Sequence, residues 1–291
     1  MFKGSIPALV TPFRDEAFDE AAFRDLVEWQ VAEGSHGLVP CGTTGESATL
    51  SADEHRRAIE VCVAQAAGRV PVIAGCGAND TAHAIALTRA AKATGADAAL
   101  HVPPYYNRPN QEGIYAHLAA IAEATDLPIL LYNVPARTVT DIAVETMARL
   151  ARIANVVAVK DATGNLARVS AQRLACGDDF VQLSGNDDMA LGFMAMGGRG
   201  CISVTANVAP RLCADFQDAC LEGRWGDALV LQDRLYPLHA ALFTDASPGP
   251  VKYALSRVRP DFPSALRLPM TPPSPASRAA VDAALAHAGL S

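Results

Sequence analysis

The sequence predicts a (β/α)8 barrel, the TIM barrel, with a helical extension at its C-terminal end. Three observations lead to this fold class. Short apolar runs alternate with stretches of helical spacing through about 220 of the 291 residues. The apolar runs are nearly continuous, which is typical of parallel strands that are buried on both faces. The alternation repeats eight times, and eight strand–helix units are the number that closes a barrel.

Each predicted strand ends at a polar or turn-forming residue. The strands are predicted at residues 6–10, 37–40, 70–74, 98–102, 129–132, 156–160, 180–183 and 200–204. Helices are predicted at residues 19–33, after Ser51, at 81–94, before Thr125 and at 142–152. Ser51 and Glu54 have the spacing of a capping box. An open doubly wound sheet is the alternative, but no Gly-x-Gly-x-x-Gly follows the first strand.

The pattern changes after about residue 223. Helical spacing covers residues 225–243, 249–258 and 276–288, and a proline-rich segment between the last two is expected to run across the surface. We therefore divide the chain into a barrel, residues 1–223, and a C-terminal helical appendage, residues 224–291. The appendage is expected to pack on the barrel instead of folding independently.

The composition excludes several classes of protein. No apolar run approaches the roughly 18–20 residues of a membrane span, and the first residues lack a signal peptide, so we expect a cytoplasmic protein without a membrane partner. The net charge of −7 argues against nucleic acid as the main partner. Seven cysteines without a Cys-x-x-Cys pair and seven scattered histidines indicate neither a disulfide framework nor a metal site, and we expect no cofactor.

Lys160 ends the sixth predicted strand, directly after the apolar residues 156–159. The carboxyl ends of parallel barrel strands are where barrel enzymes carry their chemistry. Burial beside apolar walls favours a neutral amine, which is the nucleophilic form of lysine. The alternative is a lysine that reaches the surface or pairs with Asp161, and this stretch alone favours that alternative.

Other predicted strand ends bring polar groups to the same face of the barrel. A Gly-Thr-Thr-Gly loop offers N–H groups and hydroxyls to a carboxylate, and a strand-end tyrosine can transfer protons. Each group also has an ordinary structural alternative, such as a turn, a half-buried tyrosine or a solvated arginine. Together they suit imine formation on an anionic keto acid. They are Thr43, Thr44, Tyr105, Tyr106, Tyr132, Arg137, Gly185 and Asn186.

Cys41 directly precedes this Gly-Thr-Thr-Gly loop and is a possible nucleophile by position. No histidine in the neighbouring motifs is placed to activate its thiol. We therefore interpret Cys41 as a packing residue.

At these residues the chain resembles the dihydrodipicolinate synthase branch of the pyruvate-dependent class I aldolase and N-acetylneuraminate lyase family. The resemblance covers essentially the full length. It rests on residues 42–47 (GTTGES), 104–109 (PYYNRP), 132–135 (YNVP), 160–164 (KDATG), 200–204 (GCISV) and 268–272 (LPMTP). It implies condensation of pyruvate with L-aspartate 4-semialdehyde, which gives 4-hydroxy-tetrahydrodipicolinate for diaminopimelate and lysine biosynthesis.

The resemblance also implies catalytic roles for individual residues. Lys160 is expected to form a Schiff base with pyruvate, and Tyr132 is expected to relay protons through Thr44. The resemblance implies that this relay continues to Tyr106 of the partner subunit. Family members are commonly homotetramers built as a dimer of dimers, and this use of Tyr106 requires the tight dimer.

The resemblance further implies two sets of substrate contacts. Thr43 and Thr44 are expected to bind the pyruvate carboxylate, together with Gly185 and the backbone near Ile202. Arg137 is expected to bind the carboxylate of the aldehyde. N-acetylneuraminate lyases usually carry a non-basic residue at this position, so Arg137 favours the synthase branch.

Two departures from the family pattern stand out. Ala136 replaces the serine or glycine of many synthases, a small change that should leave Arg137 in place.

The other departure lies in the lysine feedback site at the dimer interface. His83 replaces an acidic residue and Ala52 a histidine of some lysine-sensitive enzymes. The effector's ammonium thereby loses a charge-assisted partner worth about 1.5–3 kcal/mol, so we predict weak or absent inhibition. The matching effector-site positions are Ser47, Ala48, His55, Asn79 and Tyr105.

Two other functions stay open at this point. The chain could be another imine-forming aldolase, lyase or dehydratase that acts on a longer 2-keto sugar acid. It could also be a non-catalytic member that binds a keto acid as a regulator or scaffold. Intact Lys160, Tyr132 and both threonines argue against the non-catalytic reading.

Overall fold

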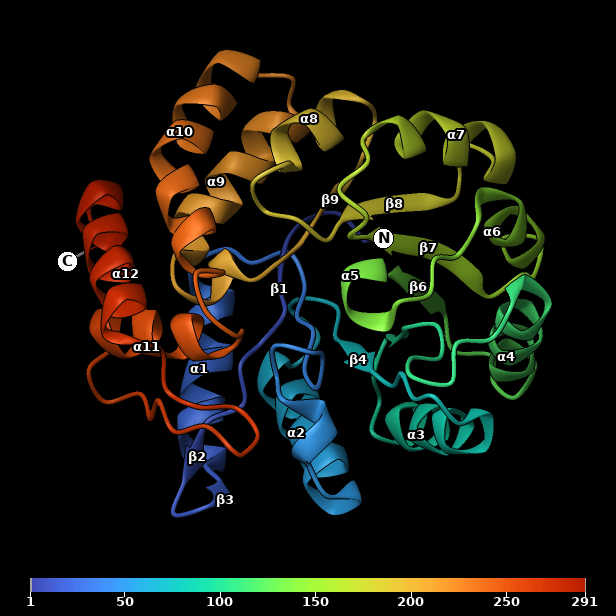
Figure 1. Ribbon diagram of the computed structural model, residues 1–291, viewed down its shortest axis with the longest axis horizontal. Helices are drawn as coiled ribbons and strands as arrows, with labels where there is room; N and C mark the ends of the chain where they lie inside the picture. The colour runs from blue at the N-terminus through green and yellow to red at the C-terminus, as the bar shows by residue number, and fades with distance from the viewer. Residues whose placement is uncertain (1, 291) are drawn as a thin grey trace.

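The chain folds into a closed barrel of parallel strands, seen in a computed structural model that describes residues 2–290 (Figure 1). Seven strands form one sheet in the order β1-β9-β8-β7-β6-β5-β4. Residues 38–39 fill the remaining position, because Val39 bridges to Ala8 after β1 and Leu38 bridges to Val72 before β4. The strands are β1 (Gly4–Pro7), β4 (Ile73–Gly75), β5 (Ala98–His101), β6 (Ile129–Asn133), β7 (Val156–Asp161), β8 (Val181–Ser184) and β9 (Gly200–Ser203). The predicted (β/α)8 barrel is confirmed.

The strand predicted at residues 37–40 is reduced to these two bridges. Prolines flank it on every side: Pro7 and Pro71 lie on its neighbours, and Pro40 ends it. A proline offers a carbonyl oxygen but no N–H donor, so each one removes a ladder hydrogen bond. The N–H of Leu38 still donates to Pro71 and that of Val39 to Pro7, at 2.9 Å each, which is enough to close the ring.

Side chains alternate between the barrel interior and its helical cover. Within β7, Ala158 belongs to the interior cluster of apolar residues, whereas Val159 belongs to the cluster under the helices. Successive residues of a strand point to opposite faces. Lys160 therefore points into the barrel, on the same side as Ala158.

Helices surround the barrel on its outside (Figure 1). They are α1 (Glu20–Ala32), α2 (Ala52–Ala66), α3 (Thr81–Ala93), α4 (Gln111–Glu123), α6 (Val144–Leu150), α7 (Ala167–Cys176), α8 (Ala190–Ala195) and α9 (Pro210–Leu221). The capping box of Ser51 and Glu54 opens α2 as predicted. Across residues 2–290, no helix is both long and apolar enough to cross a membrane.

The sequence pattern missed several short elements. A hairpin joins β2 (Phe13–Arg14) to β3 (Ala17–Phe18) through Asp15 and Glu16, both at positive φ, instead of the usual Asn-Gly turn. Single turns form η1 (Ser47–Thr49), η2 (Thr205–Asn207) and α5 (Pro135–Thr138). Pro135 at the first position favours α5, although residues 133–137 look like a plain loop in the sequence.

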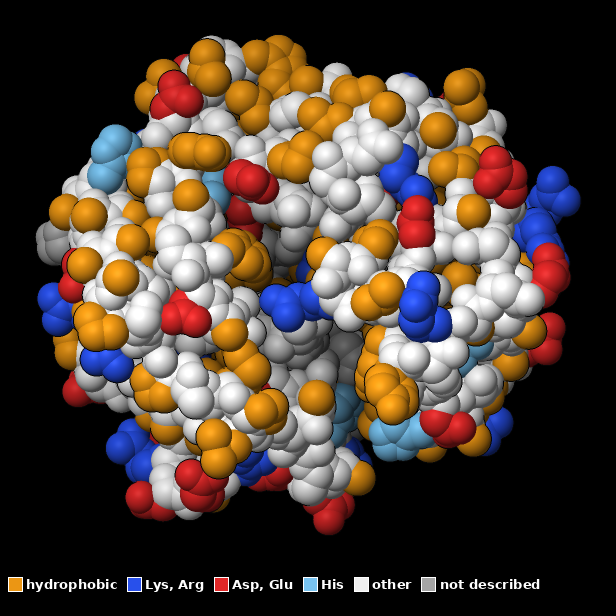
Figure 2. Space-filling view, in the orientation of Figure 1, with side chains coloured by type: hydrophobic (Ala, Val, Ile, Leu, Met, Phe, Trp, Pro, Cys, Tyr) orange, Lys and Arg blue, Asp and Glu red, His pale blue; other side chains and the backbone are white. Residues whose placement is uncertain are grey.

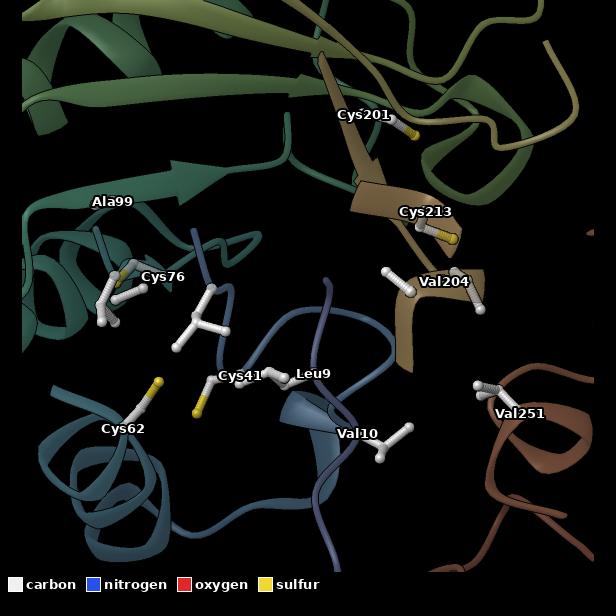
Figure 3. Packing of buried hydrophobic residues seen from close by; sticks show 14 of the residues in the cluster. Leu9, Val10, Cys41, Cys62, Cys76, Ala99, Cys201, Val204, Cys213 and Val251 are labelled. Carbon is white, nitrogen blue, oxygen red and sulfur yellow. The ribbon is translucent and has the colours of Figure 1, made fainter. Parts of the chain in front are cut away.

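The C-terminal extension consists of α10 (Trp225–Ala241), α11 (Gly249–Val258) and α12 (Pro275–Ala288), which lie together at one side of the barrel (Figure 1). Val251 of α11 joins the same apolar cluster as Val10 and Val204 (Figure 3). The segment between α11 and α12 does more than run across the surface, because Arg267 pairs with Glu54 of α2. The division between residues 223 and 224 falls between α9 and α10 and stays a prediction.

The cysteines are buried packing residues. All seven are free thiols, and six of them are buried. Figure 3 shows Cys41, Cys62 and Cys76 in one region of the apolar cluster, and Cys201 and Cys213 in another. Burial raises the pKa of the Cys41 thiol well above its usual value, which disfavours the nucleophilic thiolate. This supports the interpretation of Cys41 as a packing residue.

Candidate active site

A cavity of about 530 Å³ opens at the carboxyl ends of the strands. Figure 2 shows a hollow near the centre of this face, with basic and histidine side chains at its edge. Its walls include Thr43 after the second strand position, Tyr132 in β6 and Arg137 just after β6, and also Pro269 and Met270 of the C-terminal extension. The structure thus brings three of the predicted site residues to one space.

Lys160 lies directly behind this cavity. Its Nζ is 4.1 Å from the centroid of the Tyr132 ring, and its side chain is buried in the barrel interior with 6% of the residue exposed. The contact follows from strand register, because Tyr132 of β6 pairs with Lys160 of β7. Tyr132 itself lines the cavity, so the amine of Lys160 lies against a residue of the cavity wall.

The structural alternative for Lys160 is not realised. Asp161 points to the other face of β7, where its carboxylate accepts hydrogen bonds from Gln172 at 2.6 Å and from the Thr163 hydroxyl at 2.7 Å. The Lys160 amine neither reaches the surface nor pairs with this neighbour. A buried lysine beside a phenol, at the carboxyl end of a barrel strand, has the geometry of a reactive amine.

Gly185 gives Lys160 the space that it occupies. A Cβ at this position would lie 3.1 Å from Cε of Lys160 and 2.6 Å from Cβ of Ala162. The N–H of Gly185 also donates to the carbonyl oxygen of Asp161 at 2.7 Å. The end of β8 therefore packs against the lysine so closely that only glycine fits.

The Gly-Thr-Thr-Gly loop approaches the cavity from the second strand position. Thr43 is exposed and lines the cavity, whereas Thr44 is buried beneath it. Ile202 of β9 lies in the barrel interior together with Tyr132. Within residues 2–290, no hydrogen bond joins Tyr132 to Thr44, so the proton relay between them stays a prediction.

Arg137 lines the cavity within the single chain, whereas Tyr106 does not. The turn α5 places Arg137 at the cavity wall, where it is exposed to solvent. Tyr106 is 91% exposed and has a φ of +71°, a backbone conformation that is unfavourable for an aromatic residue. Its side chain therefore makes little contact with the described chain, and it is not among the residues that line the cavity.

The predicted effector residues line the outer part of the same cavity. Ser47, Ala48, His55, His83 and Tyr105 contribute to its walls. The side-chain amide of Asn79 donates to the carbonyl oxygen of Tyr105 at 3.3 Å, which holds the two segments together. His55 donates from Nε2 to the carbonyl oxygen of Gly75 at 2.8 Å, so its Nδ1 is an acceptor when the ring is neutral. Burial lowers the pKa of His55, which favours the neutral ring.

Sequence reasoning missed two charged residues close to the site. Glu46 belongs to the motif at residues 42–47 but received no role, and Lys252 was not singled out. The structure joins them in a buried ion pair. One signal was available, because Lys252 stands among the apolar residues Val251, Ala254 and Leu255 on the inner face of a predicted helix.

Comparison with known proteins places this chain in a family. The sequence model of the dihydrodipicolinate synthetase family matches residues 1–288. The chain belongs to the dihydrodipicolinate synthetase family. The resemblance stated from the motifs is thereby confirmed.

Curated and solved family members are similar along their whole length. The 4-hydroxy-tetrahydrodipicolinate synthase of Rhizorhabdus wittichii is 71% identical over 290 residues, which cover 100% of both chains. A solved, chloride-inhibited dihydrodipicolinate synthase from Acinetobacter baumannii, complexed with pyruvate, is 43% identical with a TM-score of 0.97 and full coverage of both chains. A solved protein described as the first monomeric dihydrodipicolinate synthase variant is 36% identical, with a TM-score of 0.97 and coverage of 100% and 98%.

Proposed function

We propose that this chain is a 4-hydroxy-tetrahydrodipicolinate synthase that condenses pyruvate with L-aspartate 4-semialdehyde through a Schiff base on Lys160. The enzyme class follows from the family and from relatives of 71% identity over the full length. The observation that supports the role of Lys160 is its buried amine, 4.1 Å from the ring centroid of Tyr132 at the carboxyl end of β7.

The first half of the reaction builds a nucleophilic carbon. The amine of Lys160 attacks the keto carbon of pyruvate, and the keto oxygen leaves as water, which gives an imine. Loss of a methyl proton then gives the enamine, because the protonated imine accepts the electron pair. Tyr132 lies beside the amine and is the proposed proton carrier for both steps.

The second half joins the two substrates and releases the enzyme. The enamine carbon attacks the aldehyde carbon, and the aldehyde oxygen takes up a proton to become a hydroxyl. The amino group of the former semialdehyde then attacks the imine carbon and displaces the Lys160 amine. This transimination closes the ring and regenerates the free lysine, with one water lost overall.

Three groups are proposed to bind the pyruvate carboxylate. The loop carrying Thr43 and Thr44 offers hydroxyls and N–H groups beside the cavity. Gly185 and the backbone near Ile202 complete the surroundings of the lysine from β8 and β9. Their common effect is to hold the keto carbon within reach of Lys160.

Arg137 is the proposed anchor of the second substrate. It lines the cavity from α5 and carries a fixed positive charge. A guanidinium binds a carboxylate through two parallel hydrogen bonds, which suits the carboxylate of aspartate semialdehyde. A 2-keto sugar acid presents hydroxyl groups at this end instead, so Arg137 favours the synthase over a sugar-acid aldolase.

A homotetramer built as a dimer of dimers is the proposed assembly. Tyr106 is 91% exposed close to the cavity and contributes nothing to its own site, which supports a role in the site of a partner subunit. Within the proposed dimer, the hydroxyl of Tyr106 would extend the relay from Tyr132 through Thr44. Sedimentation of the purified protein tests the assembly, and a monomer with full activity would contradict this role of Tyr106.

We propose that the outer part of the cavity binds lysine weakly or not at all, so that feedback inhibition by lysine is weak or absent. His55 offers an acceptor at Nδ1, but His83 takes the position at which a carboxylate would hold an ammonium group. Without that carboxylate, the site lacks the charge-assisted hydrogen bond that would favour a cationic amino acid.

A comparison of substrates tests the proposed function. We expect turnover with pyruvate and L-aspartate 4-semialdehyde to exceed cleavage of N-acetylneuraminate or keto-deoxy sugar acids by several orders of magnitude in kcat/KM. Comparable or higher turnover with a sugar acid would make the chain an aldolase or lyase of the alternative class. Binding of pyruvate without any turnover would indicate the non-catalytic alternative.

A further inference from the structure

A buried ion pair joins the C-terminal extension to the threonine loop, residues 42–47. Lys252 of α11 donates a hydrogen bond from Nζ to Oε1 of Glu46, although the two residues lie 206 positions apart. The side chain of Lys252 is 0% exposed and that of Glu46 is 1% exposed. Charged residues are almost never buried this completely unless they are paired, so the pair requires a physical explanation.

The surroundings of the pair satisfy both charges. Nζ of Lys252 also donates to the carbonyl oxygen of Ala265 at 2.7 Å and lies 4.4 Å from the centroid of the Phe13 ring. The second carboxylate oxygen of Glu46 accepts a hydrogen bond from the N–H of Arg267 at 3.1 Å. Burial lowers the pKa of Lys252 to about 8, while the carboxylate of Glu46 opposes this shift. Removal of either partner would therefore leave a buried charge without its counter-ion.

Glu46 also occupies the tight turn that carries the two threonines. Its φ is +53°, in the left-handed region that non-glycine residues rarely adopt. Its N–H donates to the carbonyl oxygen of Thr43 at 3.1 Å, and its carbonyl oxygen accepts from the N–H of Thr49 at 3.0 Å. The carbonyl oxygen of Gly45 accepts from the hydroxyl of Thr11 at 2.7 Å. A strained turn of this kind persists only when its surroundings hold it, and the Glu46 side chain supplies such an anchor.

The segment that follows α11 fixes the same loop from outside. The guanidinium of Arg267 donates to the carbonyl oxygen of Thr49 at 3.0 Å and to Glu54 at 2.8 Å. Pro269 and Met270, two and three positions after Arg267, line the same cavity as Thr43 of the loop. One stretch of the extension therefore anchors the threonine loop and forms part of the cavity wall.

We propose that Glu46 and Lys252 are positioning residues for the keto acid. The ion pair fixes the turn at residues 42–47, so that the hydroxyls and N–H groups of Thr43 and Thr44 keep the geometry that binds the carboxylate. This inference rests on the proposed function, since it takes those threonines as the pyruvate-binding groups. Stability is the competing account of the pair, and buried pairs replaced by apolar residues often leave stability unchanged.

Three variants separate positioning from stability: Glu46→Gln, Lys252→Met and the double substitution. Each single substitution leaves one buried charge without its counter-charge and is expected to lower Tm. The double substitution removes both charges, so its loss of Tm is expected to be smaller than the sum of the two single losses. The KM for pyruvate is nevertheless expected to rise about tenfold in the double variant, with kcat changed less than about threefold.

A control for stability comes from the apolar cluster between the barrel and its helices. Ile121 of α4 is fully buried and remote from the loop in the chain, so Ile121→Ala is expected to lower Tm by forming a cavity. Its KM for pyruvate should stay within about twofold of the unmodified protein. A rise in KM that simply follows the loss of Tm in all variants would overturn the positioning role.

Hydrogen–deuterium exchange supplies a readout that does not depend on pyruvate. In the double variant, amides of residues 42–49 are expected to exchange at least about tenfold faster, with α4 unchanged. Unchanged exchange in this loop would overturn the proposal whatever the substrate. If the loop loosens but the unmodified protein neither binds nor turns over pyruvate, the proposed function fails while the anchoring of the loop stands.

Discussion

Substitution of Gly185 by alanine is a sharp test of the close packing around Lys160. The added Cβ would lie 2.6 Å from Cβ of Ala162 and 3.1 Å from Cε of Lys160. Carbon atoms in contact normally lie 3.5–4.0 Å apart, so the neighbours must move by about 0.4–0.9 Å. Ala162 follows Lys160 by only two residues, and a shift of one displaces the other.

The expected loss is large in activity and moderate in stability. Overpacking of this kind costs about 1–3 kcal/mol, which corresponds to a fall in Tm of about 2–6 °C for a chain of this size. Misplacement of a reacting group by about 1 Å can cost about 10²-fold in rate, and the displacement required at Cε of Lys160 is about 0.4 Å. We therefore expect kcat/KM for pyruvate to fall about tenfold in Gly185→Ala.

The assay is steady-state condensation of pyruvate with aspartate semialdehyde, together with thermal unfolding. Gly226→Ala is the matched control, because no atom lies within 4 Å of a Cβ built at this exposed position of α10. It should leave kcat/KM unchanged. Activity of Gly185→Ala within about threefold of the unmodified protein would refute the argument that only glycine fits beside Lys160.

Three further predictions follow from other parts of the structure. Arg137→Ala should spare imine formation with pyruvate but raise the KM for the aldehyde about 10- to 100-fold; an equal loss of both would refute its role. Lysine at micromolar concentration should not inhibit steady-state turnover, and His83→Glu should increase its affinity; strong inhibition of the unmodified protein would contradict this. Burial lowers the pKa of His101 to about 3, so between pH 6.5 and 3 the unfolded chain alone takes up this proton. As the pH is lowered from 6.5 to 3, this residue should therefore reduce the free energy of unfolding by at most about 5 kcal/mol. In denaturant titrations His101→Gln should show a smaller fall, and an identical pH profile would contradict the assignment.

The barrel and its lysine could be predicted because they depend on local pattern. The apolar run at residues 156–159 identifies a buried strand. Lys160 lies two residues after Ala158, so their side chains point to the same face of the strand, into the barrel. The end of α3 near Gly95 and the start of α2 at Ser51 likewise depend on residues within one turn. Such features need no knowledge of the tertiary structure.

The parts that could not be predicted depend on contacts between distant segments or on backbone strain. Glu46 and Lys252 are 206 positions apart, and no local pattern indicates that they meet. The second strand position is shortened by Pro7 and Pro71 on the neighbouring strands. Both prolines are visible in the sequence, but the sequence does not show that they lie beside residues 38–39 in the barrel. The exposed conformation of Tyr106 at positive φ belongs to a tight turn, closed by a hydrogen bond from the N–H of Asn107 to the carbonyl oxygen of Tyr105, that no local sequence pattern indicates.

Trapping of the imine with borohydride is the decisive test of a Schiff base on Lys160. The protein is incubated with pyruvate and borohydride, and the reduced adduct is located by mass spectrometry of peptides. We expect a single modified residue, Lys160, and no adduct in Lys160→Ala. An adduct at any other lysine, or none in the unmodified protein, would contradict the proposed mechanism.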